Sequence, residues 1–234
     1  MYYTVFGDDM KETIYTIPVN EAFDEKCGCP ICRMYNALEK IEIERISGAA
    51  MMEPDVRMET NKSGFCKDHF AKLCELGKAL PTALMIESHL DHIKKYFEYI
   101  PPKKKMNMMA SKLRMLNNDC YVCGRVRQFF ACELDALFLM LKEEDFKKKF
   151  DEAEYFCLPH LELLITYAPS YLKKKECEEF LKKLLDKEKA YFEKPHTDVG
   201  DFCKTFDHRF SESDFPNSKG STTRAITAII GERE

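Results

Sequence analysis

The chain has 234 residues, with 36 Lys and Arg against 40 Asp and Glu, a formal net charge of -4, 45% hydrophobic residues and 32% charged residues. This composition excludes wholesale disorder, and the balanced charge argues against a dedicated nucleic-acid-binding protein, which carries a marked basic excess. The 11 cysteines are too few for a disulfide scaffold in a chain of this length. The cysteines are therefore the feature to explain.

The first residues carry no basic segment followed by an apolar core, so the sequence does not predict a secretory signal peptide. The most apolar stretch, residues 129–141, contains Glu133 and Asp135 and is too short to cross a bilayer. We therefore expect a cytoplasmic protein without membrane insertion. In a reducing compartment, cysteines at motif spacing are metal ligands or redox groups more often than disulfides.

The cysteines form an internal repeat, in which two Cys-x-x-Cys pairs alternate with two Cys-x-x-His pairs. The second member of each Cys-x-x-Cys pair is followed 34 positions later by a Cys-x-x-His pair, and all four residues recur at an offset of 91. The eight residues are Cys29, Cys32, Cys66, His69, Cys120, Cys123, Cys157 and His160. We infer two tandem copies, 27–100 and 118–194.

The first part of the chain predicts a loose N-terminal lead-in over 1–26, with Thr13–Phe23 extended, and then the helices of the first copy. Apolar spacing and proline positions predict a helix from Cys32 to Met52 and a short one from Pro54 to about Gly64. A further helix begins at Cys66, and another has Pro81 as its first residue and stops before Pro101. Residues 101–117 form a linker with a short helix.

The second copy repeats this plan. The expected helices are 123–141, 144–150, 157–167 ended by Pro169, and 170–192. From 195 to 234 we expect a loop-rich tail that ends in a short helix, Thr222–Ile230, with Ile226 and Ile230 against the core. No segment shows sustained alternation of apolar and polar residues, so the predicted fold is all-α.

The ligand-type residues suit a metal site. A pair two residues apart at the first turn of a helix places both side chains on one face, and the helix N-terminus stabilises thiolates. Three thiolates and one imidazole form the ligand set of a closed tetrahedral zinc site. An iron–sulfur cluster is the alternative cofactor.

The spacing of the motifs does not decide which Cys-x-x-Cys pair shares a site with which Cys-x-x-His pair. A helix of about 20 residues rises about 30 Å, and the next dozen residues can return that distance. The first hypothesis therefore closes each site within one copy, as Cys29/Cys32/Cys66/His69 and Cys120/Cys123/Cys157/His160. The other hypothesis pairs the ligands across the copies, so that Cys29/Cys32 meet Cys157/His160.

Other residues carry weaker signals. Cys27 lies beside the first Cys-x-x-Cys pair and is a candidate alternative ligand or redox group, and the favoured alternative is an incidental surface thiol. In the tail, Lys204, Asp207, His208 and Arg209 could orient an anionic ligand or a partner's carboxylate. The alternative is that Phe202, Phe206 and Phe210 hold the tail to the core while these charges face water. Three further cysteines on helical stretches are expected in the core, namely Cys74, Cys132 and Cys177.

Motifs along nearly the whole chain resemble an uncharacterised bacterial family, a domain of unknown function found mainly in anaerobic Gram-positive bacteria. The matching segments are Tyr15–Phe23, Cys29–Arg33, Pro54–Arg57, Gly64–Cys66 with His69, Lys204 with Phe206–Arg209, and Asn217–Lys219. The resemblance implies that the Cys and His sets belong to the plan of the fold, and it supplies no activity.

The sequence favours a zinc-binding helical protein with two structural Cys3His sites, acting as an interaction or adaptor module for an unknown protein partner. The alternative is a redox enzyme or sensor that uses an iron–sulfur cluster or a reactive thiol, with Cys27 as the reactive group. No nucleophile with a base, no phosphate-binding glycine loop and no paired catalytic carboxylates emerge, which disfavours an ordinary hydrolase or nucleotide enzyme.

Overall fold

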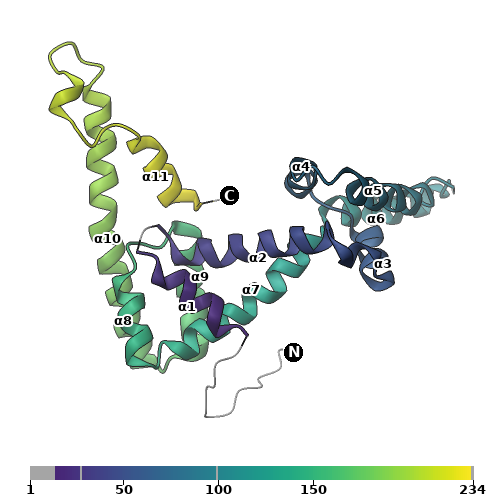
Figure 1. Ribbon diagram of the computed structural model, residues 1–234, viewed down its shortest axis with the longest axis horizontal. Coiled ribbons are helices and arrows are strands. Elements are labelled where there is room, and N and C mark those ends of the chain that lie inside the picture. Colours follow the sequence, from purple (N-terminus) through teal and green to yellow (C-terminus); the bar gives the residue numbers. More distant parts are fainter. Residues whose placement is uncertain (1–13, 27, 99, 233–234) are drawn as a thin grey trace. The chain divides into compact units, whose positions relative to one another are not determined.

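The computed structural model describes residues 14–26, 28–98 and 100–232, leaving aside the side chain of Glu212. Within these residues the chain forms 11 α-helices and three short 3-10 helices, and no strand (Figure 1). The all-α prediction is confirmed.

The helices follow the predicted order with shifted ends. From the N-terminus they are α1 (Thr16–Asp24), α2 (Pro30–Ile46), η1 (Ala49–Met52), α3 (Pro54–Ser63), α4 (Lys67–Glu75), α5 (Ala79–Lys94), η2 (Lys103–Lys105) and α6 (Met106–Asn118). They continue as α7 (Tyr121–Met140), α8 (Glu144–Glu152), α9 (Leu158–Tyr171), α10 (Lys174–Lys204), η3 (Glu212–Asp214) and α11 (Ser221–Ile230).

The chain divides into two compact units that cut across both sequence copies. Unit 1 comprises Met1–Asn36 with Cys132–Glu234, and unit 2 comprises Ala37–Ala131. The two boundaries fall inside α2 and α7. Helix α2 therefore begins in unit 1 and ends in unit 2, whereas α7 begins in unit 2 and ends in unit 1.

An aromatic cluster forms part of the core of unit 1. Phe23 of α1 lies 5.1 Å from Phe146 of α8 between ring centroids, and Phe150 lies 4.9 Å from Phe156. The extended lead-in predicted for Thr13–Phe23 is wrong over α1, because Val19 and Phe23 repeat at helical spacing and are buried. Residue 13 lies outside the described residues.

Two prolines lie inside helices where the sequence predicted ends. Pro195 lies within α10, which runs on to Lys204, and Pro169 lies in the last turn of α9. Proline removes one helix hydrogen bond. Pro195 is buried and lines a small cavity with Ile229 of α11. Pro169 is exposed, and the last turn of α9 packs through Tyr171, whose ring stacks on Phe138 at 5.0 Å.

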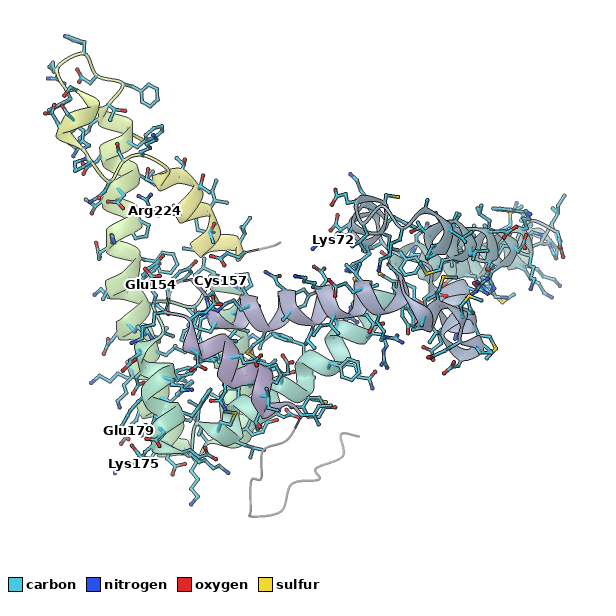
Figure 2. All side chains as sticks on the ribbon, viewed as in Figure 1. Lys72, Glu154, Cys157, Lys175, Glu179 and Arg224 are labelled. Atoms are coloured by element: carbon cyan, nitrogen blue, oxygen red, sulfur yellow. The ribbon has the colours of Figure 1, made fainter. Side chains whose placement is uncertain are left out.

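Helix α11 lies alongside α10, and the Arg224–Asp198 ion pair at 3.2 Å joins the two (Figures 1 and 2). Ser221 and Ala228 are the buried residues of α11. The prediction that Ile226 and Ile230 pack on the core is wrong, since they are 52% and 63% exposed.

A close backbone approach in unit 2 explains the Gly-Phe-Cys motif. Gly64 has φ +61°, and a Cβ added there would lie 2.4 Å from Nε2 of His89. The Nδ1 of that ring donates to the Asn61 carbonyl at 2.8 Å, which fixes it over the glycine. Only glycine fits this turn, which leads directly into Cys66 and α4.

Glu133 of α7 is an unusual core residue, only 2% exposed, and its Oε2 has no hydrogen-bond partner among the described residues. Burial raises the pKa of this carboxyl to about 8. Between pH 4.5 and about 8, this carboxyl is therefore neutral in the folded protein and ionised in the unfolded chain. Its contribution to stability is present below the unfolded pKa of 4.5 and is lost as the pH rises towards 8.

Glu133→Gln is therefore expected to stabilise the protein at pH 8 by on the order of 3 kcal/mol and to change little near pH 5. Urea unfolding at both pH values measures the difference. Glu178→Gln, at an exposed position of α10, is the control and should change stability at neither pH. An equal effect of Glu133→Gln at the two pH values would show that the carboxyl is not neutral in the fold.

Candidate metal centres

The structure gathers the eight repeated Cys and His residues into two clusters, each of three cysteines and one histidine. Cluster 1 consists of Cys29, Cys32, Cys157 and His160, and cluster 2 of Cys66, His69, Cys120 and Cys123. Within each cluster the four ligand atoms lie within 4.8 Å of one another. The hypothesis that each site closes within one copy is wrong, and the crossed pairing is the one observed.

Cluster 1 lies in unit 1, where the start of α2 meets the start of α9 (Figure 2). The Sγ atoms of Cys32 and Cys157 are 3.6 Å apart. The Nδ1 of His160 lies 3.5 Å from Cys29 Sγ, 3.4 Å from Cys32 Sγ and 3.1 Å from Cys157 Sγ. The imidazole nitrogen therefore faces all three thiols.

Cluster 2 has the same plan in unit 2, where the start of α4 meets the start of α7. The Sγ atoms of Cys66 and Cys123 are 3.9 Å apart. The Nδ1 of His69 lies 3.1 Å from Cys66 Sγ, 3.2 Å from Cys120 Sγ and 3.4 Å from Cys123 Sγ. In both clusters the same ring nitrogen points at the sulfurs.

These spacings match the edges of a zinc tetrahedron. Zinc bonds of about 2.3 Å to sulfur and 2.0–2.1 Å to nitrogen give tetrahedral edges of about 3.8 Å between sulfurs and about 3.6 Å from sulfur to nitrogen. The observed sulfur–sulfur distances are 3.6 and 3.9 Å, and the sulfur–nitrogen distances run from 3.1 to 3.5 Å. The spacing of the ligand atoms in each cluster is therefore close to the one that a single metal ion requires.

Helix starts position the ligands. Cys66 and Cys157 are the N-cap residues of α4 and α9, so each histidine three residues later lies on the first turn. Cys29 and Cys120 come directly before α2 and α7. Four helix N-termini thus surround the two clusters in pairs, and their partial positive charge favours thiolates.

The charges of cluster 2 are unbalanced without a cation. Burial raises the pKa of Cys120, but the hydrogen bond and charge of His69 outweigh burial and lower it to about 6. Burial and the neighbouring Cys120 thiolate raise the pKa of Cys123 to about 12. The cluster therefore accepts one thiolate readily and resists the next. A divalent cation removes this repulsion and lets the remaining thiols ionise.

Cluster 1 behaves alike. Despite burial, hydrogen bonds from Cys157, Cys32 and His160 lower the pKa of Cys29. Beside this thiolate the other two thiols resist ionisation: hydrogen bonds to Cys157 and Cys29 raise the pKa of Cys32, and the hydrogen bond to Cys29 contributes most to raising the pKa of Cys157 to about 12.

A carboxylate orients the histidine of cluster 2. Oε1 of Glu39, on α2, lies 2.9 Å from Nε2 of His69, and Lys72 pairs with the other oxygen. Burial lowers the pKa of His69, but hydrogen bonds to Cys120 and Glu39 outweigh it and raise the pKa to about 10. A carboxylate on the far nitrogen of a ligand histidine holds the ring and makes it a stronger donor to metal.

Glu39→Gln is expected to weaken zinc binding at cluster 2 by about 10- to 100-fold, because it removes the negative charge behind His69. Competition with a zinc chelator of known affinity measures the change. Glu44→Gln, an exposed change on the same helix, should leave the affinity unaltered. Equal zinc affinities of Glu39→Gln and the control would show that Glu39 does not contribute to metal binding.

A second carboxylate supports cluster 1. Glu188 of α10 is buried, and its Oε1 accepts a hydrogen bond of 2.9 Å from the backbone N–H of Phe156, the residue before Cys157. Sequence reasoning missed both Glu39 and Glu188. Neither belongs to the ligand motifs, and a glutamate on a charged helix carries no signal that separates it from its neighbours.

The candidate residues of the tail make local contacts on the surface. Arg209 donates to Asp207 at 3.0 Å, Lys204 pairs with Asp201 at 2.7 Å, and the side chain of His208 is 93% exposed. Phe206 is 78% exposed, so it does not hold this segment to the core. Cys27 lies outside the described residues.

The other described cysteines lie outside the clusters. Cys177 is buried as expected, Cys132 is half-buried, and Cys74 and Cys203 are exposed. The prediction of a core position is therefore wrong for Cys74.

Comparison with protein families matches residues 10–234 to a family described as "Family of unknown function (DUF6062)". The expectation of an uncharacterised family is confirmed. No curated protein and no solved structure matches the chain. Among the helices of the described residues, none combines the length and the apolar character that a membrane span requires.

Proposed function

We propose that this chain, which belongs to the family of unknown function DUF6062, is a zinc-binding helical protein with one structural ion in each cluster. The observation that carries the proposal is the pair of Cys3His sets whose four ligand atoms lie within 4.8 Å of one another. Four protein ligands leave no open coordination position for a substrate, which favours a structural role over a catalytic one. Each ion would then contribute its binding energy to folding.

The spacing of the ligand atoms favours one ion over an iron–sulfur cluster. In a cluster of several irons each ligand binds a separate iron, so the four ligand atoms stand farther apart than around one ion. Here the sulfurs of Cys32 and Cys157 are 3.6 Å apart, and those of Cys66 and Cys123 are 3.9 Å apart. Thiolate and imidazole ligands in a tetrahedron are the set that zinc prefers.

Elemental analysis and an absorption spectrum of anaerobically purified protein test this function. The expected result is two zinc ions per chain in a colourless protein. Brown protein with several irons per chain would support the iron–sulfur alternative. Fewer than one zinc or iron per chain would overturn the metal-binding function.

The adaptor role rests on the surface around α6. None of the 13 residues of α6 is buried, and Met106, Met108 and Met115 are each more than half exposed. Residues 94–118 carry seven Lys and Arg against one Glu, although the whole chain is acidic. Exposed methionines bind apolar helix faces of varied shape. An acidic amphipathic helix of a partner protein is the occupant that fits this basic and apolar segment.

Fluorescence anisotropy with a synthetic acidic amphipathic helix tests this surface. We expect binding that weakens with salt and falls at least tenfold in Lys103→Glu/Lys104→Glu, because these lysines lie in η2 beside α6. Lys174→Glu/Lys175→Glu is the matched control on α10. Equal loss in both variants, or equal binding of a basic helix with the same apolar face, would overturn the proposed partner.

A further inference from the structure

Two residues that follow α11 lie against cluster 1. We call Gly231–Glu232 the C-terminal strap. The backbone N–H of Glu232 donates to Sγ of Cys32 at 3.3 Å, and the Asn36 side chain donates from Nδ2 to the Glu232 carbonyl at 3.2 Å. The strap is thus hydrogen-bonded to a ligand sulfur and to α2, the helix that carries that ligand.

Gly231 lies against two ligand sulfurs. Its φ is +87°, and a Cβ added there would lie 3.2 Å from Sγ of Cys32 and 3.3 Å from Sγ of Cys157. A side chain would therefore press on both thiols from a backbone conformation that only glycine adopts easily. The Gly231 N–H donates to the Thr227 carbonyl at 2.8 Å, which continues the strap from α11.

The two clusters differ in access to water. In cluster 1, Cys29, Cys32 and Cys157 are 0%, 2% and 0% exposed. In cluster 2, Cys66 and Cys123 are only half-buried. Sγ of Cys120 accepts backbone hydrogen bonds from Cys123, at 3.5 Å within the Cys-x-x-Cys turn, and from Cys66, and both donors are themselves residues of cluster 2. The three thiols of cluster 1 are therefore enclosed, and its half-buried ligand is His160, whereas cluster 2 has two half-buried thiols.

We infer that the two metal sites are kinetically unequal: the C-terminal strap retains the ion of cluster 1, while cluster 2 exchanges its ion with the surroundings. A chelator removes zinc by approaching the ion and displacing thiolates one at a time. Burial blocks that approach, and a backbone N–H bond to a thiolate sulfur makes the sulfur less reactive. The inference rests on the proposed function, since it concerns the same two sites.

Zinc release from the zinc-loaded protein into an excess of the chelator 4-(2-pyridylazo)resorcinol tests the inference. The expected trace has two phases of one ion each, at rates that differ at least tenfold. Cys66→Ser should abolish the fast phase alone. Gly231→Ala should speed the slow phase at least tenfold and leave the fast phase unchanged. Gly200→Ala is the matched glycine control, because a Cβ there meets no atom within 4 Å.

Asn36→Ala provides a second variant that touches neither a ligand nor the glycine, and it should also speed the slow phase. Release of both ions at one rate from the wild type would overturn the inference while leaving the proposed function intact. A slow phase that neither Gly231→Ala nor Asn36→Ala alters would do the same. A purified chain that holds no zinc would instead overturn the proposed function and the inference with it.

Discussion

Cys32→Ser combined with Cys157→Ser is expected to lower the zinc content from two ions per chain to one. Both residues belong to cluster 1, although they come from different sequence copies. Losing two of four ligands leaves that site unable to hold zinc, while cluster 2 keeps its full set. Elemental analysis of the purified variant measures the remaining ion.

The complementary variant separates the two pairings. Cys32→Ser with Cys66→Ser changes two residues of one copy but removes one ligand from each cluster. We expect both sites to be weakened and the zinc content to fall towards zero under mild chelation. Pairing within copies predicts the reverse outcome for the two variants, so a single ion in Cys32→Ser/Cys66→Ser would contradict the crossed arrangement. Cys74→Ser, at an exposed position, controls for loss of a thiol and should keep two ions.

Removal of both ions is expected to unfold much of the chain. Structural zinc supplies about 10–16 kcal/mol in zinc-finger peptides, which equals or exceeds the net stability of about 5–15 kcal/mol of a typical domain. Without the ions, the clusters also bring together thiols that resist ionisation. Far-UV circular dichroism under reducing conditions should show a large loss of helix on chelation and its recovery when zinc is restored.

Acid should act in the same direction as chelation, because protons compete with zinc for the thiolates and the imidazoles. The two treatments should therefore give the same loss of helix when the zinc lost is equal. Magnesium added in place of zinc is the control, since a cation that prefers oxygen ligands should restore nothing. A chelated chain that keeps its helical signal and unfolds cooperatively would contradict a structural role for the ions.

The sequence predicted the helical class and most helix starts for local reasons. Pro54 begins α3, and Cys66 directly precedes α4, much as the spacing indicated. The errors lie where packing overrides local preference. Pro195 continues α10 because it is buried beside α11, and α1 forms because Phe23 packs on α8. Such contacts join residues far apart in the chain, and local patterns do not encode them.

The ligands were predictable from the sequence, but their pairing was not. The 34-residue interval is long enough for a chain to leave and return, so it is compatible with either pairing. Helix α2, with 17 residues, starts beside cluster 1 in unit 1, and its residues from Ala37 onward belong to unit 2. The chain reaches Cys66 there without returning, so Cys66 meets Cys120 and Cys123. Helix α7 carries the chain back in the same manner.

The crossed pairing also sets an order of assembly during synthesis. The last ligand of cluster 2 is Cys123, whereas cluster 1 needs His160 and its strap needs Glu232. The loops that close the two sites span 57 residues from Cys66 to Cys123 and 125 from Cys32 to Cys157, a difference worth only about 0.7 kcal/mol in closure entropy. The order in which the ligands emerge from the ribosome therefore decides which cluster forms first, more than the length of the closing loops does. Cys29 and Cys32 are the first of the eight ligands to be synthesised, but their cluster is complete only after His160. The nascent chain therefore carries two unligated thiols after all the residues of unit 2 have been synthesised.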